Sequence, residues 1–352
     1  MMDSHILARS RGVLTWRWNC SLGITRSLRR PAGWGIAGAM EGQSGAESRP
    51  VNIVFDRNRR RRNSPSETVA ESDEGEPIMV NREDLDWRTV EAGGRNIHYG
   101  EVGEGPPLVL LHGTGPGSDA WGNFRHNIGP LSESFRVIAV DLPRFGGSEK
   151  LSVNQPRLDF LSRSVRDFMD AIGVESADVI GNSMGAQTAM KLAIDSPDRV
   201  RRLVLMAPAA VGYSIFSPMP TEAGRQIAGY YKGEGPTRSK MERLLKSLAY
   251  DPEFVTDAMI TERFEASIEP DVLEINQGAH WSRQSLEGEL HRCVAPSLLV
   301  WGQDDRATTL DIGLLLLRKL PDARLHVFAR CGHWAQAEHA DEFNRLVVGF
   351  LA

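Results

Sequence analysis

Cysteine is scarce in this sequence. Only three cysteines occur among its 352 residues, at Cys20, Cys293 and Cys331. Three widely spaced cysteines do not suggest a disulfide framework or a zinc site, and a reducing compartment is the default for such a chain. We therefore expect a cytoplasmic protein that binds no metal.

The sequence also lacks an excess of basic residues and any long apolar run. The formal net charge of −5 gives no indication of nucleic-acid binding. No apolar run approaches the roughly 20 residues that a membrane-spanning helix needs. We therefore expect neither nucleic acid nor a membrane as a partner. Hydrophobic residues form 41% of the chain, which suffices for a substantial core in one large domain.

The first 80 residues lack a hydrophobic period. They hold scattered arginines, four consecutive arginines at residues 59–62 and then an acidic run, with frequent Gly, Ser and Pro. This composition predicts a disordered extension over residues 1–80. Two alternatives stay open. The arginine-rich start can be an organelle transit peptide, which it resembles, or translation can begin at Met40 or Met79, so that the residues before it are not made.

A serine stands at the centre of the Gly-Asn-Ser-Met-Gly motif at residues 181–185. An apolar run precedes the motif and a helix-like stretch follows it. This order is typical of the nucleophile elbow of serine hydrolases, where glycines leave room for a sharp strand-to-helix turn. We predict that Ser183 is a nucleophile, and that the N–H of Met184 points at any oxyanion formed there. The alternative is an ordinary loop serine.

Short apolar runs recur at regular intervals from about residue 84. Continuous runs of Val, Ile and Leu are what strands buried on both faces require, and amphipathic stretches with helical spacing lie between them. We predict an α/β-hydrolase fold, in which helices flank a mostly parallel central sheet and the site lies at the carboxyl ends of the strands. The runs fall at residues 108–111, 136–140, 179–180, 203–206, 297–300 and 324–328.

No strand-like run occurs over residues 209–290. Residues 237–248 and 253–267 instead have the spacing of amphipathic helices. We expect a helical lid, inserted after the sixth strand, over the catalytic edge of the sheet; a structural cap without substrate contacts is the alternative. The expected organisation is an extension, a first part of the core, the lid and a second part of the core, at residues 1–80, 81–208, 209–290 and 291–352.

A serine nucleophile needs a base, and the base needs an orienting acid. In this fold class the chain order is serine, acid, histidine. Two carboxylates follow the strand that ends at residue 302; we predict Asp305 as the acid and keep Asp304 as the alternative. We predict that His333, in the loop after the last strand, is the base. The weaker competitors for this role lie in a strand, in the following helix or before the acid: His326, His339, His280 and His291.

An oxyanion hole needs two backbone donors. Beside Met184, we expect the second donor in the glycine-rich loop at residues 112–117, because glycine lets the backbone approach a substrate closely. We assign it to Thr114, with Gly113 as the alternative. His112 is predicted to be a structural hydrogen-bonding residue beneath this loop.

These motifs together resemble the α/β-hydrolase superfamily and, more narrowly, the meta-cleavage-product hydrolases, which break carbon–carbon bonds in ring-opened aromatics. The resemblance covers roughly residues 84–352. Its most specific parts are Gly-Thr-Gly-Pro-Gly at residues 113–117 and Cys-Gly-His-Trp at residues 331–334. Further matches occur at Trp121, Asn123 and residues 181–185, 216–220, 301–306, 325–328 and 338–344.

The resemblance implies a reaction. The family hydrolyses the C5–C6 bond of a 2-hydroxy-6-oxo-hexa-2,4-dienoate to a 2-hydroxypenta-2,4-dienoate and a carboxylic acid. The 2-keto tautomer must form first, because the departing electrons can then spread into a conjugated enolate. The implied steps are ketonisation mediated by His333, which Asp305 orients, attack by Ser183 on the C6 carbonyl, and hydrolysis of the acyl-enzyme. No metal or organic cofactor is implied.

The resemblance also implies a binding site for the small-molecule substrate. Arg263, in the lid, matches the family's carboxylate-binding arginine, and a guanidinium fork suits a planar carboxylate; a solvated helix arginine is the alternative. Asn182, Asn123 and Trp334 match residues that contact the dienoate end, although either asparagine can instead satisfy nearby backbone groups. Gly113 completes the expected set. The family also implies a homo-oligomer, a dimer or larger.

Two positions depart from the family pattern. Residues 307–309 read Ala-Thr-Thr, where the family often has bulky apolar residues and a proline that line the pocket for the 6-substituent. The acyl half of the substrate is therefore expected to differ in size or polarity. Arg144 stands where the family usually has glycine, and the sequence offers no functional account of it.

Two other functions use parts of the same pattern. An ordinary carboxylesterase or acyl hydrolase shares the triad but has no use for Arg263 over the site. A non-catalytic ligand receptor on this fold normally has a broken triad, whereas Ser183, Asp305 and His333 are all present. The preferred prediction is therefore the carbon–carbon bond hydrolase.

Overall fold

The fold is seen in a computed structural model that describes residues 53–56, 80–209, 212, 214–277, 282 and 284–352. The central sheet of these residues has nine strands in the order β1-β9-β8-β7-β6-β4-β5-β3-β2. Neighbouring strands are parallel, except that β3 is antiparallel to both β2 and β5. The predicted α/β-hydrolase fold with a mostly parallel sheet is thus confirmed. The strands are β1 Ile53–Asp56, β2 Asp86–Glu91, β3 Asn96–Val102, β4 Pro107–Leu111, β5 Arg136–Val140, β6 Ala177–Asn182, β7 Val200–Met206, β8 Ser297–Gly302 and β9 Ala323–Phe328.

The strand β1 corrects one expectation. Residues 53–56 fall in the segment expected to be disordered, yet they pair in parallel with β9 from Leu325 to Phe328. Their sequence, Ile-Val-Phe-Asp, begins with two β-branched residues and an aromatic residue, which favour a strand. The remaining residues expected to be disordered, apart from Val80, lie outside the described residues.

Two helical layers cover the sheet, one on each face. Successive side chains of a strand point to opposite faces, and β4 shows this directly: Val109 and Leu111 belong to one buried cluster, whereas Leu108 and Leu110 belong to the other. The first cluster includes α3 Arg157–Ala171, α4 Met184–Asp195 and α9 Leu310–Lys319; the second includes α1 Ala120–Phe124, α2 Ile128–Ser132, α10 Ala335–Glu338 and α11 Ala340–Leu351. Short 3-10 helices are η1 Arg82–Asp84, η2 Pro197–Arg199, η3 Pro252–Phe254 and η4 Leu290–Arg292.

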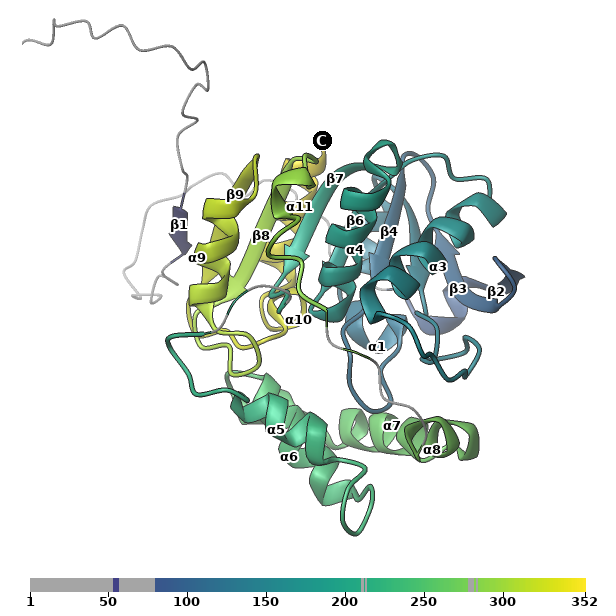
Figure 1. The fold of residues 1–352 in the computed structure, drawn as a ribbon, viewed down its shortest axis with the longest axis vertical. Helices are drawn as coiled ribbons and strands as arrows, with labels where there is room; N and C mark the ends of the chain where they lie inside the picture. Colours follow the sequence, from purple (N-terminus) through teal and green to yellow (C-terminus); the bar gives the residue numbers. More distant parts are fainter. Residues whose placement is uncertain (1–52, 57–79, 210–211, 213, 278–281, 283) are drawn as a thin grey trace, which may run out of the picture. The chain divides into compact units, whose positions relative to one another are not determined.

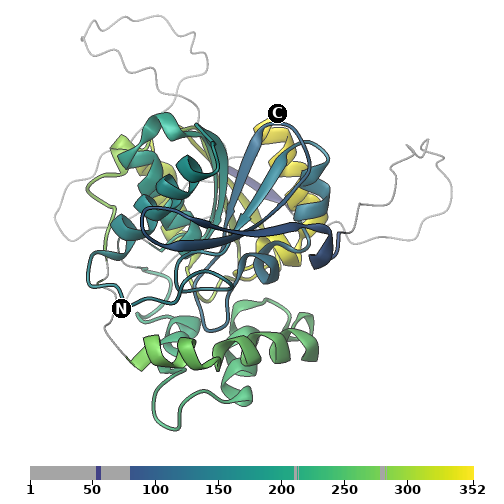
Figure 2. The ribbon, with the colours of Figure 1, turned by 90° about the vertical axis from the view of Figure 1, so that its right-hand side faces the viewer.

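In the described part of the chain, four α-helices lie between β7 and β8, where the lid is expected. They are α5 Glu222–Gly229, α6 Arg238–Leu248, α7 Asp257–Ser267 and α8 Pro270–Gln277, and we call them the lid helices. Figures 1 and 2 show these green helices beyond one end of the sheet. The helices α5, α6 and α7 share a small core that includes Tyr230, Met241 and Leu245, and Trp334 from the main domain packs into it.

The helix α7 begins later than the sequence pattern predicts. The pattern favours a helix from Glu253, but Glu253 lies in η3 and α7 starts at Asp257. The reason is the cap: the Thr256 side chain accepts a hydrogen bond from the Met259 N–H, which fixes the first turn at this point.

Candidate active site

Ser183 lies between β6 and α4 in a strained turn. Its φ is +51°, a region that residues other than glycine rarely adopt, and its N–H donates to the Met206 carbonyl at 2.7 Å. Both flanking glycines are required by close backbone contacts. A Cβ at Gly181 would lie 2.5 Å from the Ala186 Cα, and one at Gly185 would lie 1.9 Å from the Leu111 carbonyl oxygen. The geometry therefore presents the serine at the apex of a tight strand-to-helix turn.

His333 and Asp305 form a buried pair at the carboxyl ends of β9 and β8. Their Nδ1 and Oδ2 atoms are 2.8 Å apart, and the two residues are 6% and 4% exposed. The other carboxylate oxygen of Asp305 accepts hydrogen bonds from the N–H groups of Ala307 and Thr308 at 2.7 and 2.9 Å. These bonds fix the carboxylate so that it holds the imidazole by Nδ1 and leaves Nε2 as the basic nitrogen. Asp304 is exposed, so the geometry favours Asp305 over Asp304.

Ser183 and His333 are linked through their neighbours. The side-chain amide of Asn182, the residue before the serine, donates to the His333 carbonyl at 3.4 Å. Among the described residues there is no direct hydrogen bond between Ser183 and His333. Nucleophile–base contacts commonly tighten only in the substrate complex. The lid also reaches this point, because the His333 N–H donates to the carbonyl of Leu248, the last residue of α6, at 2.7 Å.

The glycine-rich loop after β4 lies directly against the serine turn. A Cβ at Gly113 would be 2.7 Å from Asn182 Oδ1 and 3.5 Å from Ser183 Cβ, so a larger residue here would displace the Asn182 amide. His112 is buried beneath the loop, where its Nε2 accepts from the Leu142 N–H at 3.0 Å and its Nδ1 donates to the Gly113 carbonyl at 2.8 Å. Both ring nitrogens are therefore engaged in hydrogen bonds to the backbone. Burial lowers the pKa of His112, which favours the neutral ring.

Asn123 and Asn182, which are expected to bind the dienoate end of the substrate, contact each other. Asn123 Nδ2 donates to Asn182 Oδ1 at 3.3 Å, and Asn123 Oδ1 is buried without a hydrogen-bond partner in the described part of the chain. A buried amide oxygen of this kind normally has a donor, which a ligand can supply. Trp334, 8% exposed, packs instead against the lid core.

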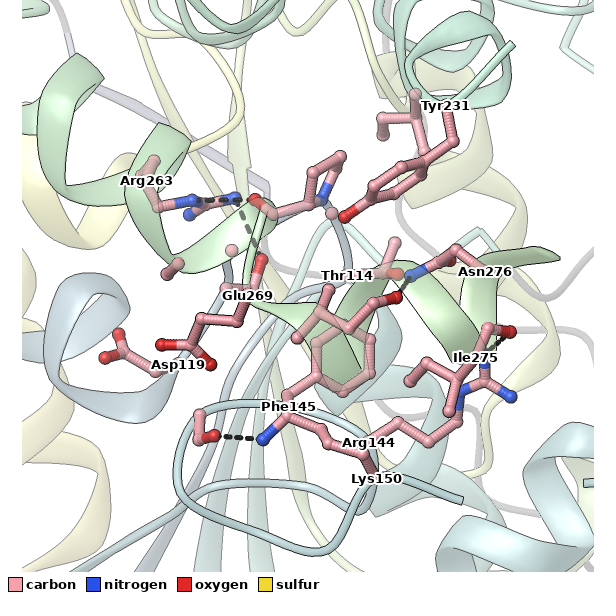
Figure 3. A pocket seen from close by; sticks show the side chains of 18 of the residues that line it. Thr114, Asp119, Arg144, Phe145, Lys150, Tyr231, Arg263, Glu269, Ile275 and Asn276 are labelled. Carbon is pink, nitrogen blue, oxygen red and sulfur yellow. Dashed lines mark hydrogen bonds between the residues drawn. The ribbon is translucent and has the colours of Figure 1, made fainter. Parts of the chain in front are cut away.

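Arg263 connects the lid to the glycine-rich loop. It lies in α7, and its guanidinium donates to the Pro116 carbonyl at 3.1 Å and to Ser118 Oγ at 2.9 Å (Figure 3). Burial lowers the pKa of this group. A Cβ at Gly117 would be 2.1 Å from the Arg263 carbonyl oxygen, so helix and loop touch through their backbones. The arginine is therefore not a solvated helix residue.

A cavity of about 1370 Å³ lies between the lid and the main domain. Its lining includes Thr114 and Met184, the two expected oxyanion donors, together with Arg263. Ser183, Asp305 and His333 are not among its lining residues, so the cavity reaches the loop beside the serine rather than the serine itself. Residues 307–309, where the sequence departs from the family, also lie outside this lining.

Several lining residues have no counterpart in the sequence prediction. Asp119 caps α1 by accepting the Gly122 N–H at 2.7 Å. Burial, and secondly the neighbouring Asp141 carboxylate, raises the pKa of Asp119 to about 6. The only sequence signal for Asp119 is its place as a helix cap, which does not indicate that it faces a cavity. Other unpredicted lining residues are His98, Arg144, Lys150 and Arg157.

Within the part of the chain that the structure describes, no cluster of three or more His, Cys, Asp or Glu side chains is arranged to hold a metal ion. Helices of sufficient length and apolar character to cross a bilayer are likewise missing from these residues.

Residues 108–346 match the alpha/beta hydrolase family. The chain is similar to the 2-hydroxy-6-oxo-6-phenylhexa-2,4-dienoate hydrolase of Comamonas testosteroni, at 40% identity over 72% of this chain and 91% of that protein. It is also similar to the 2-hydroxy-6-oxononadienedioate/2-hydroxy-6-oxononatrienedioate hydrolase of the same organism, at 39% identity over 73% of this chain and 91% of the relative. Among solved structures, the meta-cleavage product hydrolase of Pseudomonas fluorescens IP01 is similar with a TM-score of 0.69 and 34% identity, over 77% of this chain and 98% of that one.

Proposed function

We infer the function of this protein from its family, because the chain belongs to the α/β hydrolases and, within them, to the meta-cleavage-product hydrolases. We propose that it hydrolyses the C5–C6 bond of a 2-hydroxy-6-oxo-hexa-2,4-dienoate. The products are a 2-hydroxypenta-2,4-dienoate and a carboxylic acid. The observation that carries the proposal is Arg263, because its guanidinium is hydrogen-bonded onto the loop beside the serine turn, where an ordinary esterase needs no cation.

Arg263 binds the substrate carboxylate in this proposal. Its guanidinium already holds the carbonyl of Pro116 and the hydroxyl of Ser118, which fixes its plane for a bidentate partner. Asn123 and Asn182 bind the adjacent oxygen at C2, and the buried Oδ1 of Asn123 supports this role. Trp334 and Gly113 complete the walls of this subsite.

Ketonisation comes next. His333 Nε2 moves a proton from the C2 hydroxyl to C5, which leaves a ketone at C2 and a tetrahedral C5. The hydrogen bond from Nδ1 to Asp305 supports the transient imidazolium. This step is required because it prepares C2 to accept the electron pair of the bond that breaks.

The serine then attacks. Ser183 Oγ adds to the C6 carbonyl while His333 takes its proton, and the N–H groups of Met184 and Thr114 stabilise the oxyanion. The C5–C6 bond breaks, its electron pair enters the conjugated enolate, which takes the proton held by His333, and the acyl group remains on the serine. Water, deprotonated by His333, releases the carboxylic acid. Every proton transfer in this sequence uses His333, the substrate or water.

We also propose that the protein acts in the cytoplasm as a homo-oligomer, a dimer or larger. The family resemblance supports the assembly, and the sparse cysteines support a reducing compartment. Light scattering of the purified protein tests the assembly: a mass near 78 kDa or above supports it, and a mass near the 38.9 kDa of one chain contradicts it.

The replacement Ser183→Ala tests the mechanism. Wild-type protein is expected to bleach the visible colour of the dienoate and to turn over aryl esters poorly. Without the nucleophile, Ser183→Ala should lose cleavage by about a thousandfold or more, yet still accumulate the ketonised substrate in rapid-mixing spectra, because proton transfer does not need the serine.

The matched control is Ser176→Ala, which removes a hydroxyl at the opposite end of β6. This variant should cleave like wild type. Strong esterase activity without loss of dienoate colour would show that the protein is an ordinary acyl hydrolase.

A further inference from the structure

The lid helices dock on two different loops of the main domain. The helix α7 is held on the glycine-rich loop by Arg263, whereas α5 and α6 are held on the loop that follows β8. The Thr221 side chain, which caps α5, donates to the Ala307 carbonyl at 2.9 Å. Arg306 Nη2 donates to the Lys246 carbonyl near the end of α6 at 2.8 Å. In Figure 1, α5 and α6 accordingly lie on the side of α10, and α7 and α8 lie below α1.

The end of α6 crosses the loop that carries His333. The His333 N–H donates to the Leu248 carbonyl at 2.7 Å. A Cβ on Gly332 would lie 2.3 Å from the same carbonyl oxygen and 2.7 Å from the Tyr250 nitrogen, so the two backbones are in direct contact. A shift of the end of α6 therefore moves the backbone of the expected base or breaks its hydrogen bond.

One carboxylate joins these two segments. Glu338, the last residue of α10, accepts hydrogen bonds at Oε1 from the N–H groups of Gly332 and Trp334, at 3.0 and 3.3 Å. These two residues flank His333 in the chain. The other oxygen, Oε2, accepts from the Tyr250 N–H in the lid at 2.7 Å and from the Gly332 N–H at 3.2 Å. All hydrogen bonds of Glu338 among the described residues thus come from backbone N–H groups, and they tie the base loop to the lid.

The position of the base matters for the reaction. The His333 imidazole is held at Nδ1 by Asp305, and its Nε2 must come within about 3 Å of the Ser183 hydroxyl to remove the proton. Burial raises the pKa of the Glu338 carboxyl, whereas the three N–H groups lower it and favour the charged form. Hydrogen bonds to an ionised carboxylate are stronger than neutral ones. Glu338 is therefore well suited to fix the backbone of the base.

We propose that Glu338 is a positioning residue, which couples the docking of α6 to the placement of the His333 imidazole beside Ser183. The bond from Tyr250 and the bonds from the base loop share one carboxylate, so the base is held in its reactive position only while the end of α6 is docked. Glu338 does not touch the reacting atoms and acts through His333. For a dienoate the inference rests on the proposed function, whereas for an aryl ester it needs only the serine and its base.

Two replacements break the two sides of this link. Glu338→Gln keeps the size of the side chain, but an amide has only one acceptor oxygen, so either the base loop or the lid faces an NH₂ group. Tyr250→Pro removes the lid N–H, and the extended backbone of Ala249 before it is compatible with a following proline. In rapid-mixing single turnovers, each variant should lower the rate constant of dienoate cleavage by about tenfold or more, with full amplitude. The KM should change by less than about twofold, because Arg263 keeps its contacts.

The matched controls keep the link. Tyr250→Ala retains the backbone N–H and removes only a side chain that is 42% exposed. Glu342→Gln removes the same charge from α11, where the carboxylate pairs with His339 at 3.6 Å. Both variants should keep the wild-type rate constant. The amplitude of a single turnover reports the fraction of active molecules, so a purely structural loss of folded protein lowers the amplitude and leaves the rate constant unchanged.

The outcomes are distinguishable. If Glu338→Gln keeps the wild-type rate constant, or loses amplitude alone, the positioning role is wrong. If Glu338→Gln is slow but Tyr250→Pro is as fast as Tyr250→Ala, the coupling to the lid is wrong. If the wild type hydrolyses an aryl ester but leaves the dienoate intact, the proposed function alone is overturned. Single turnovers of the ester, with the protein in excess, then decide the role of Glu338 by the same comparison.

Discussion

At the scale of single residues, two histidines at the same sheet edge have different hydrogen-bond partners and therefore different roles. His333 hydrogen-bonds a carboxylate through Nδ1. His112 donates from Nδ1 to a carbonyl and accepts a backbone N–H at Nε2. A base needs a nitrogen with a lone pair directed at substrate, and only the first arrangement leaves one. Sequence position alone distinguishes the two less well, because both histidines follow a buried strand.

The replacement Asp305→Asn tests this assignment. The two N–H groups at Asp305 Oδ1 would retain the amide oxygen, so the amide nitrogen would face His333 Nδ1 and impose the wrong tautomer. We expect kcat on the dienoate to fall by about a thousandfold or more. Asp304→Asn, at the exposed neighbouring carboxylate, is the control and should keep wild-type activity. A large loss in Asp304→Asn with little change in Asp305→Asn would reverse the assignment.

At the scale of elements, the lid is docked by backbone contact. A Cβ built on Gly117 would be only 2.1 Å from the carbonyl oxygen of Arg263. A second contact is the ion pair between Arg125, just after α1, and Glu262 of α7, at 3.1 Å. The position of α7 therefore depends on a glycine in the loop that is expected to supply an oxyanion donor.

The replacement Gly117→Ala tests this docking. The new methyl group must push α7 away from the loop, so we expect kcat/KM for the dienoate to fall by about a hundredfold, since a displacement near 1 Å can have an effect of this size. Gly233→Ala is a close control, because Gly117 and Gly233 both have a φ of +66° but a Cβ on Gly233 meets nothing within 4 Å. Equal losses in the two variants would mean that backbone strain, rather than the lid contact, is responsible.

At the scale of the whole molecule, the sequence predicts the sheet well and the cavity poorly. Buried parallel strands are uniformly apolar, so runs such as residues 203–206 are visible without a structure. The strand β1 is not, because its four residues lie within a polar segment and its partner β9 is about 270 residues away.

The cavity is hidden for a related reason. Its lining combines a loop residue, Arg144, and the first residue of a helix, Arg157, with lid residues such as Arg263, which lie far apart in the sequence. The serine elbow and the loop before His333 carry their own sequence signatures because the backbone there has little freedom. The cavity lining has no such local signature, and residues 307–309, which the family pattern suggests for the C6 substituent, are not part of it.

The most direct measurement is the identity of the products. Purified protein is incubated with a 2-hydroxy-6-oxo-hexa-2,4-dienoate in ¹⁸O-labelled water, and the products are analysed by mass spectrometry. We predict equal amounts of a 2-hydroxypenta-2,4-dienoate and a carboxylic acid, with label from water incorporated into the acid. A carbon skeleton that stays intact while the protein hydrolyses aryl esters rapidly would contradict the account.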